Sequence, residues 1–287
     1  MNPLQFLTTS RLAIVAGKGG VGKTTVTAVL ARAAIRQGLR VLVIELDGKP
    51  TLARLLPDLE VLSLSATAAL AEYLDTHGLS RVTKRLASSG IIEVVATASP
   101  GIDDIVVLGK IKQLERSGDY DLILVDGPAA GHAITFLLAA KSLRSSMRGG
   151  PINTQAVEVA EMLADPARCQ VVLVTLPETT PVNEALETAA SLTERVGVRL
   201  GPIVVNGVDD GEPLPAEAAD ADSPMRRAAE FRNARRQLHR DECARLAAQL
   251  ALPQLHVPHA GGAMVDAATV DTLADSITLR AGGEVAS

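Results

Sequence analysis

The chain has 287 residues, of which 47% are hydrophobic and 21% charged, and its formal net charge is -5. This composition is typical of a globular protein rather than a disordered one, and the length suffices to bury a sizeable core. The acidic balance argues against a surface that binds nucleic acid or an anionic membrane throughout. Aromatic residues make up only 2%, which argues against stacking platforms for bases.

The cysteines and the apolar runs indicate in which cellular compartment the protein is expected. Cys169 and Cys243 form no C-x-x-C pair, so we expect structural thiols in a reducing cytosol and no cysteine-based zinc or iron–sulfur site. The first residues lack the basic and apolar regions of a signal peptide. No apolar run reaches the roughly 18 residues of a membrane span. We therefore expect a cytoplasmic protein without direct membrane insertion.

Aliphatic runs alternate with stretches of helical periodicity from residue 11 onward. The runs RLAIVA, RVLVIEL and YDLILVDG are unbroken, as in strands that are buried on both faces of a parallel sheet. We predict an α/β fold with a mostly parallel central sheet flanked by helices. The predicted strands are 11–16, 40–46, 91–98, 120–127, 169–176, 198–207 and 254–258. The predicted helices are 23–38, 102–118, 133–146, 151–166, 181–197, 225–250 and 265–277, with loop and two short helices over 48–90.

The whole chain, 1–287, is predicted to form a single domain. Residues 133–168 are predicted to be a small helical insertion in it. Residues 208–224 are acidic and rich in Ala and Pro, which indicates a flexible loop. The arginine-rich helix that follows is interpreted as a solvated face with internal ion pairs.

A phosphate-binding motif follows the first predicted strand. Residues 17–24 read G-x-x-x-x-G-K-T between a strand and a helix, which is the context that the motif requires. The glycines let successive backbone N–H groups point at one phosphate, and the helix adds its positive end. Lys23 supplies a charge to the outer phosphates, Thr24 a hydroxyl ligand for Mg²⁺, and Thr25 a contact to the α-phosphate. The predicted nucleotide-binding residues of the loop are Gly19, Gly20, Val21, Gly22, Lys23, Thr24 and Thr25.

A second lysine, Lys18, precedes the glycines. The stretch KGGVGKTT resembles the deviant Walker A loop of the SIMIBI class of P-loop NTPases, dimeric ATPases that include MinD, ParA, the nitrogenase iron protein and the arsenite-pump and tail-anchored-protein-targeting (ArsA/Get) family. DGPAAGH and DPARCQVVLVTLPETTPVNEALE are similar to the ArsA/Get family, and ELDGKPTLARLL to its short, single-copy actinobacterial branch. The resemblance implies ATP hydrolysis in which Lys18 reaches the partner's phosphates and Lys23 its own. A solvated loop charge is the alternative for Lys18.

Two aspartates end predicted strands. The resemblance makes Asp47 the switch I residue that orients the attacking water, and Asp126 the Walker B residue that holds Mg²⁺. It places the helical insertion directly after switch II, where His132 could couple nucleotide state to the next helix. The family's Asp-Pro-Ala is here Asp47-Gly48-Lys49-Pro50, and nothing in the sequence explains Lys49. The alternatives are a cap of a strand end or loop for Asp47, a turn-forming role for Asp126 and a plain helix-start histidine for His132.

Asn206 and Pro258 follow later strands and resemble the family's adenine-contacting positions. The Asn206 side chain has both the donor and the acceptor that an adenine edge needs, although an asparagine before Gly207 also suits a turn. The expected cofactors are therefore ATP or ADP and Mg²⁺.

The resemblance implies a homodimer, or a heterodimer with a paralogous ATPase, that acts on a protein partner or a membrane-protein client. Three functions stay open: a targeting factor, an ATPase subunit of an anion or metalloid pump, and a ParA/MinD-like positional ATPase. The missing cysteine cluster argues against arsenite, and the acidic charge argues against nucleic acid. The apolar residues of 133–168 either line a small client patch or pack against the sheet.

Overall fold

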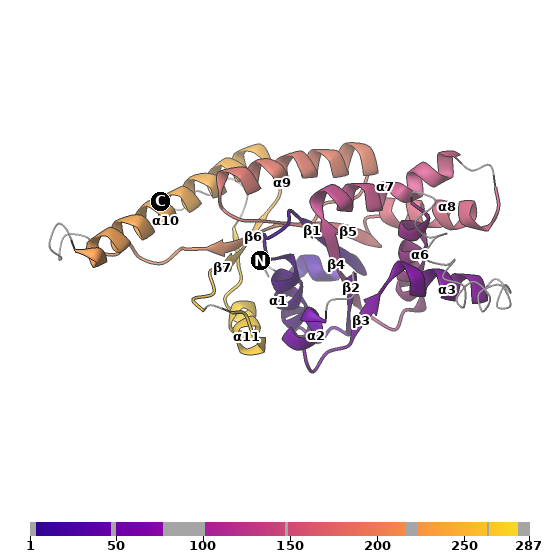
Figure 1. Cartoon of the computed structure of the whole chain (residues 1–287), viewed down its shortest axis with the longest axis horizontal. Helices are drawn as coiled ribbons and strands as arrows, with labels where there is room; N and C mark the ends of the chain where they lie inside the picture. Colours follow the sequence, from indigo (N-terminus) through magenta and orange to yellow (C-terminus); the bar gives the residue numbers. More distant parts are fainter. Residues whose placement is uncertain are drawn as a thin grey trace.

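The computed structural model describes residues 4–46, 50–76, 101–146, 149–215, 223–262 and 264–280. In this part of the chain an eight-stranded sheet runs through the molecule in the order β3-β2-β4-β1-β5-β6-β7-β8 (Figure 1). All neighbouring strands are parallel except β7 and β8. The strands are β1 (Leu12–Gly17), β2 (Val41–Leu46), β3 (Val61–Leu64), β4 (Leu122–Ala129), β5 (Cys169–Thr175), β6 (Ile203–Val208), β7 (Gln254–Pro258) and β8 (Thr278–Arg280). The predicted α/β fold with a mostly parallel sheet is confirmed.

Helices cover both faces of this sheet. The described helices are η1 (Gln5–Thr8), α1 (Lys23–Arg36), α2 (Thr51–Leu55), α3 (Ala66–Thr76), α6 (Ile102–Ser117), α7 (Ala130–Ser146), α8 (Pro151–Ala164), α9 (Thr179–Ser191), the π-helical turn η2 (Leu192–Val196), α10 (Pro224–Gln249) and α11 (Ala267–Asp275). None of them combines the length and the hydropathy that a membrane crossing would need.

The sheet separates two aliphatic cores, one on each of its faces. Alternate residues of β1 point to opposite sides, so Leu12 and Ile14 join one core while Ala13 and Val15 join the other. The first core packs under α6, α7, α8 and α9, and the second under α1, α2 and α11. Strand β4 leads directly into α7, on the face opposite α1.

The predicted insertion 133–168 corresponds to most of α7 and to α8, which pack on each other and on α6. Its apolar side chains point into the core: Phe136, Leu137, Val159 and Leu163 are each at most 6% exposed. Of the two interpretations of these residues, the structure therefore supports packing against the sheet. Helix α10 extends beyond the sheet at its amino-terminal end (Figure 1).

Some element predictions were wrong at short or interrupted segments. Strands β3 and β8 were not predicted, and β6 begins at Ile203 rather than at 198. Pro202 has no N–H to donate to a ladder, so Leu200 makes only an isolated bridge to Val171. The predicted strand 91–98 lies outside the described residues, as do 216–222 of the predicted loop.

Candidate functional site

The loop between β1 and α1 has a backbone that only glycine permits at several positions. Gly20 and Gly22 adopt φ values of 86° and 87°, in the left-handed region. A Cβ on Gly17 would lie 2.3 Å from the carbonyl oxygen of Val174 on the neighbouring strand. The loop therefore curls tightly against the sheet and presents the first N–H groups of α1, which is an arrangement that binds phosphate.

Lys23 lies within the curl of this loop. Its Nζ donates a hydrogen bond of 3.2 Å to the carbonyl oxygen of Lys18. Burial lowers the pKa of Lys23, and the nearby charge of Asp126 partly opposes that shift. A partly desolvated ammonium beside a glycine-rich loop is suited to neutralise the oxygens of a phosphate chain.

Lys18 points elsewhere. Its Nζ lies 2.6 Å from Oε1 of Glu184, a residue of α9, and its side chain is 55% exposed. The two lysines of one loop thus face different partners. Glu184 was not identified from the sequence, because 166 residues separate it from Lys18 and no motif links them.

Asp126 faces α1 near the carboxyl end of β4. Thr24 Oγ1 donates to its Oδ2 at 2.7 Å, and Thr27 Oγ1 donates to its Oδ1 at 3.3 Å. Burial raises the pKa of Asp126, while the bonds from both threonines and the charge of Lys23 lower it. A hydroxyl and a carboxylate in contact form an oxygen donor set that fits Mg²⁺, so Thr24 and Asp126 are the residues that would hold this ion.

A cavity of about 290 Å³ lies between the phosphate loop and the strands that follow β5. Thr25, Asn206 and Pro258 all line it, so the predicted loop and base-contacting residues meet in one place. Asn206 also has a contact that the sequence did not indicate, since its Nδ2 donates to the carbonyl oxygen of Val21 at 2.9 Å. Its donor group therefore bonds the phosphate loop in this structure.

Two further residues were predicted for the site. Asp47, together with Gly48 and Lys49, lies outside the described residues, so its proposed role rests on the sequence. His132 is exposed and lines a separate cavity of about 510 Å³, together with Asp103 and Asp104 of α6. Burial and the charge of Asp103 raise the pKa of Asp104, and the charge of His132 partly opposes that shift.

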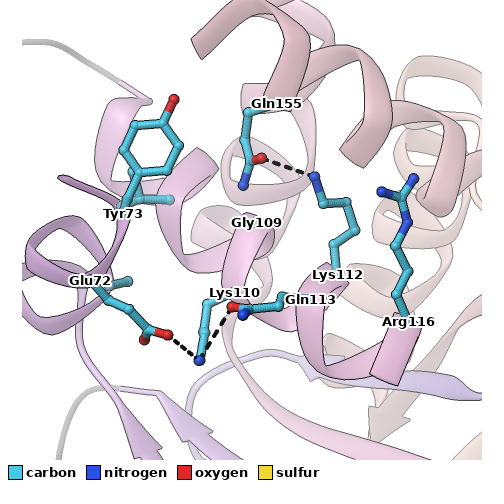
Figure 2. Close-up of a pocket in the computed structure, with 10 residues that line it drawn as sticks. Glu72, Tyr73, Gly109, Lys110, Lys112, Gln113, Arg116 and Gln155 are labelled. Carbon is cyan, nitrogen blue, oxygen red and sulfur yellow. Dashed lines mark hydrogen bonds and ion pairs between the residues drawn. The ribbon is translucent and has the colours of Figure 1, made fainter. Parts of the chain in front are cut away.

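A third cavity, of about 300 Å³, lies between α3, α6 and α8. Figure 2 shows Lys112 reaching toward Gln155, and Lys110 toward both Glu72 and Gln113. Its cations already have acidic partners, because Lys110 pairs with Glu72 while Lys112 and Arg116 share Glu158. We interpret this cluster as an ion-pair network that joins the three helices.

Comparison with known proteins adds a family to this geometry. Residues 10–150 match the family model described as anion-transporting ATPase. Over 221 residues the chain is 33% identical to the ATPase BagA of Mycobacterium tuberculosis. This match covers 68% of this chain and 64% of that protein. Arsenical pump-driving ATPases of Acidiphilium multivorum and Escherichia coli are 30% and 29% identical over 236 and 233 residues. These matches cover 75% of this chain and only 38% of each pump-driving ATPase.

Proposed function

The chain belongs to the family of anion-transporting ATPases, and on that premise we propose that it hydrolyses Mg²⁺-ATP between two ATPase subunits. The second subunit is another copy of this chain or a paralogous ATPase. Nucleotide binding closes the pair and hydrolysis opens it, and this change acts on a protein partner or a membrane-protein client. The matches span less than half of the length of each arsenical pump-driving relative, so the pump function is the second candidate.

The observation that carries this proposal is the different direction of the two loop lysines. Lys23 bonds within its own loop, whereas Lys18 is mostly exposed and reaches outward to Glu184 on α9. A lysine needed only for the chain's own phosphates would lie with Lys23. An outward lysine beside a phosphate loop is placed to meet the nucleotide of a second subunit.

Each residue of the site has a separate task in this proposal. The loop N–H groups and Lys23 bind the phosphate chain, while Thr24 and Asp126 hold Mg²⁺, which neutralises charge on the outer phosphates. Lys18 completes the partner's site. Asp47 orients the attacking water, as the sequence predicts, and the cavity lined by Asn206 and Pro258 receives the adenine.

A matched pair of variants tests the proposal. Lys23→Ala abolishes ATP binding, whereas Lys18→Ala keeps binding and loses both hydrolysis and the ATP-dependent rise in mass. Light scattering with and without ATP measures the mass, on the chain alone and mixed with a paralogue. ATP turnover by a species that stays monomeric under all these conditions would contradict the two-subunit site.

The exposed surface supports a choice between the two kinds of partner. Among the described residues, the large exposed apolar side chains are Leu214, Met225, Phe231, Leu238 and Met264. None of them belongs to α7 or α8, most of whose apolar residues are buried in the core or packed against it. A folded protein surface is therefore a better match for that insertion than a bare transmembrane helix. Cross-linking from exposed positions of α7, with ATP and with ADP, tests this choice.

A further inference from the structure

Glu45 is a buried acid inside an aliphatic strand. It is only 3% exposed, and it follows Val41–Ile44 of β2, all of which belong to the two cores. Because side chains alternate along a strand, Glu45 shares the α1 face with Val41 and Val43. A carboxylate buried in such surroundings is costly unless hydrogen bonds satisfy it.

Two backbone groups supply those bonds. Oε1 of Glu45 accepts from the N–H of Thr51 at 3.1 Å and from the N–H of Leu52 at 3.2 Å. Both belong to the first turn of α2, where N–H groups have no acceptor within the helix. Pro50, the residue before α2, provides no side-chain cap. Glu45 thus caps a helix from a neighbouring strand, and its negative charge lies at the positive end of that helix.

The same carboxylate lies beside the phosphate-binding end of the sheet. Glu45 pairs with Asp126 in the register of β2 and β4, and both side chains face α1. Glu45 therefore joins the start of α2 to the strand position beside Asp126.

We infer that Glu45 is a positioning residue for ATP hydrolysis, which fixes the start of α2 against the end of β2 next to Asp126. The inference rests on the proposed ATPase function and concerns the same site. The carboxylate of Glu45 joins the end of β2 to the start of α2, and in the sequence Asp47 stands between these two elements. Loss of this anchor lowers turnover more than it lowers nucleotide affinity, because the phosphate loop itself is untouched.

The test compares Glu45→Ala with Glu45→Gln and with a control. Gln keeps a carbonyl acceptor for the two N–H groups, whereas Ala removes it. Glu115 is a matched control, because it is another buried acid, 4% exposed, and its partner Arg168 bonds Leu12 at the start of β1, whereas the phosphate loop follows the end of β1. Glu115→Ala and Glu45→Ala both lower the melting temperature, so stability alone does not separate them.

Kinetics and hydrogen exchange do separate them, when measured well below the melting temperatures. Glu45→Ala lowers kcat about tenfold, as expected for about 1.4 kcal/mol lost from the transition state, and leaves the Kd for ADP within about threefold. Glu45→Gln restores most of the turnover, and Glu115→Ala keeps it. The amide hydrogens of Thr51 and Leu52 exchange faster in Glu45→Ala than in the wild-type chain. In Glu115→Ala they exchange at the wild-type rate.

Three results overturn the role of Glu45: unchanged exchange at Thr51 and Leu52 in Glu45→Ala, an equal loss of kcat in Glu115→Ala, or weaker ADP binding with kcat retained. A different result overturns the ATPase proposal itself. In that case the wild-type chain neither binds nor hydrolyses ATP, and Lys23→Ala changes nothing.

Discussion

The side-chain amide of Asn206 bonds the carbonyl oxygen of Val21, and this contact joins β6 to the phosphate loop. Asn206 also lines the 290 Å³ cavity that we assign to the adenine. One side chain therefore contacts both the loop proposed to bind phosphate and the space proposed for the base. The sequence suggested only the second role.

Asn206→Ala should weaken the binding of tripolyphosphate as well as of ATP. Loss of one hydrogen bond, about 1 kcal/mol, predicts about fivefold weaker binding of both ligands, because the loop loses its tie to β6. Titration calorimetry measures both affinities. Asn233→Ala is the control, since Asn233 makes a similar backbone contact, to Leu214, on α10. Unchanged tripolyphosphate affinity would mean that Asn206 serves the base alone.

Gly22→Ala should abolish nucleotide binding in a chain that still folds. A Cβ there would lie 2.3 Å from Nδ2 of Asn206, and the residue has a left-handed φ of 87°. Gly38→Ala has a nearly equal φ of 84° but no atom within 4 Å of its Cβ, so it costs about 1 kcal/mol of stability and keeps binding. Fluorescent-nucleotide titration with circular dichroism distinguishes the two. Equal binding by both variants would remove the steric argument.

Asp121 should stabilise the folded state at neutral pH and lose this contribution in acid. Its pKa is lowered to about 2, first by the side-chain hydrogen bonds from Arg40 and then by the Arg40 backbone N–H. A folded pKa below the unfolded value means that the contribution is present above about pH 4 and is lost as pH falls toward 2. Asp121→Asn should therefore flatten part of the fall in unfolding free energy between these pH values. Urea unfolding at several pH values measures it, and parallel curves would contradict the prediction.

Lys112→Ala should destabilise the α3–α6–α8 cluster without changing ATP affinity. Lys112 is 6% exposed and bonds Gln155 (Figure 2) and also Glu158, so its loss leaves two half-buried polar groups without this partner and costs about 2 kcal/mol. Lys110→Ala, whose side chain is 20% exposed and pairs with Glu72, should cost less. Thermal unfolding ranks the two. A loss that is larger for Lys110 would show that burial does not decide the cost here.

The long aliphatic strands and the phosphate loop could be predicted because their signals are local. β1, β2 and β4 correspond to mostly apolar runs in the sequence. The loop motif at residues 17–24 predicts that a helix begins there, and α1 begins at Lys23. β3 has only four residues and an exposed Ser63 in the middle, so it carries no comparable signal. β8 is an edge strand of three residues.

The contacts within the site were less predictable because they join distant segments. Glu184 meets Lys18 across 166 residues, and Asn206 meets Val21 across 185. Glu45 was overlooked for a different reason. It stands inside the run RVLVIEL, where a single acid does not interrupt the strand signal, and its purpose depends on a helix that begins six residues later.

At the end of β4 the chain passes from one face of the sheet to the other within a few residues. Asp126 faces α1, Gly127 lies so close to β1 that a Cβ would be 2.5 Å from the carbonyl oxygen of Val15, and Ala130 already begins α7 on the opposite face. A protein docked on α7 would thus sense a shift at Asp126 through the covalent chain itself. The proposed nucleotide site and the proposed partner surface on α7 are thus joined by one short stretch of backbone, without a relay of side chains.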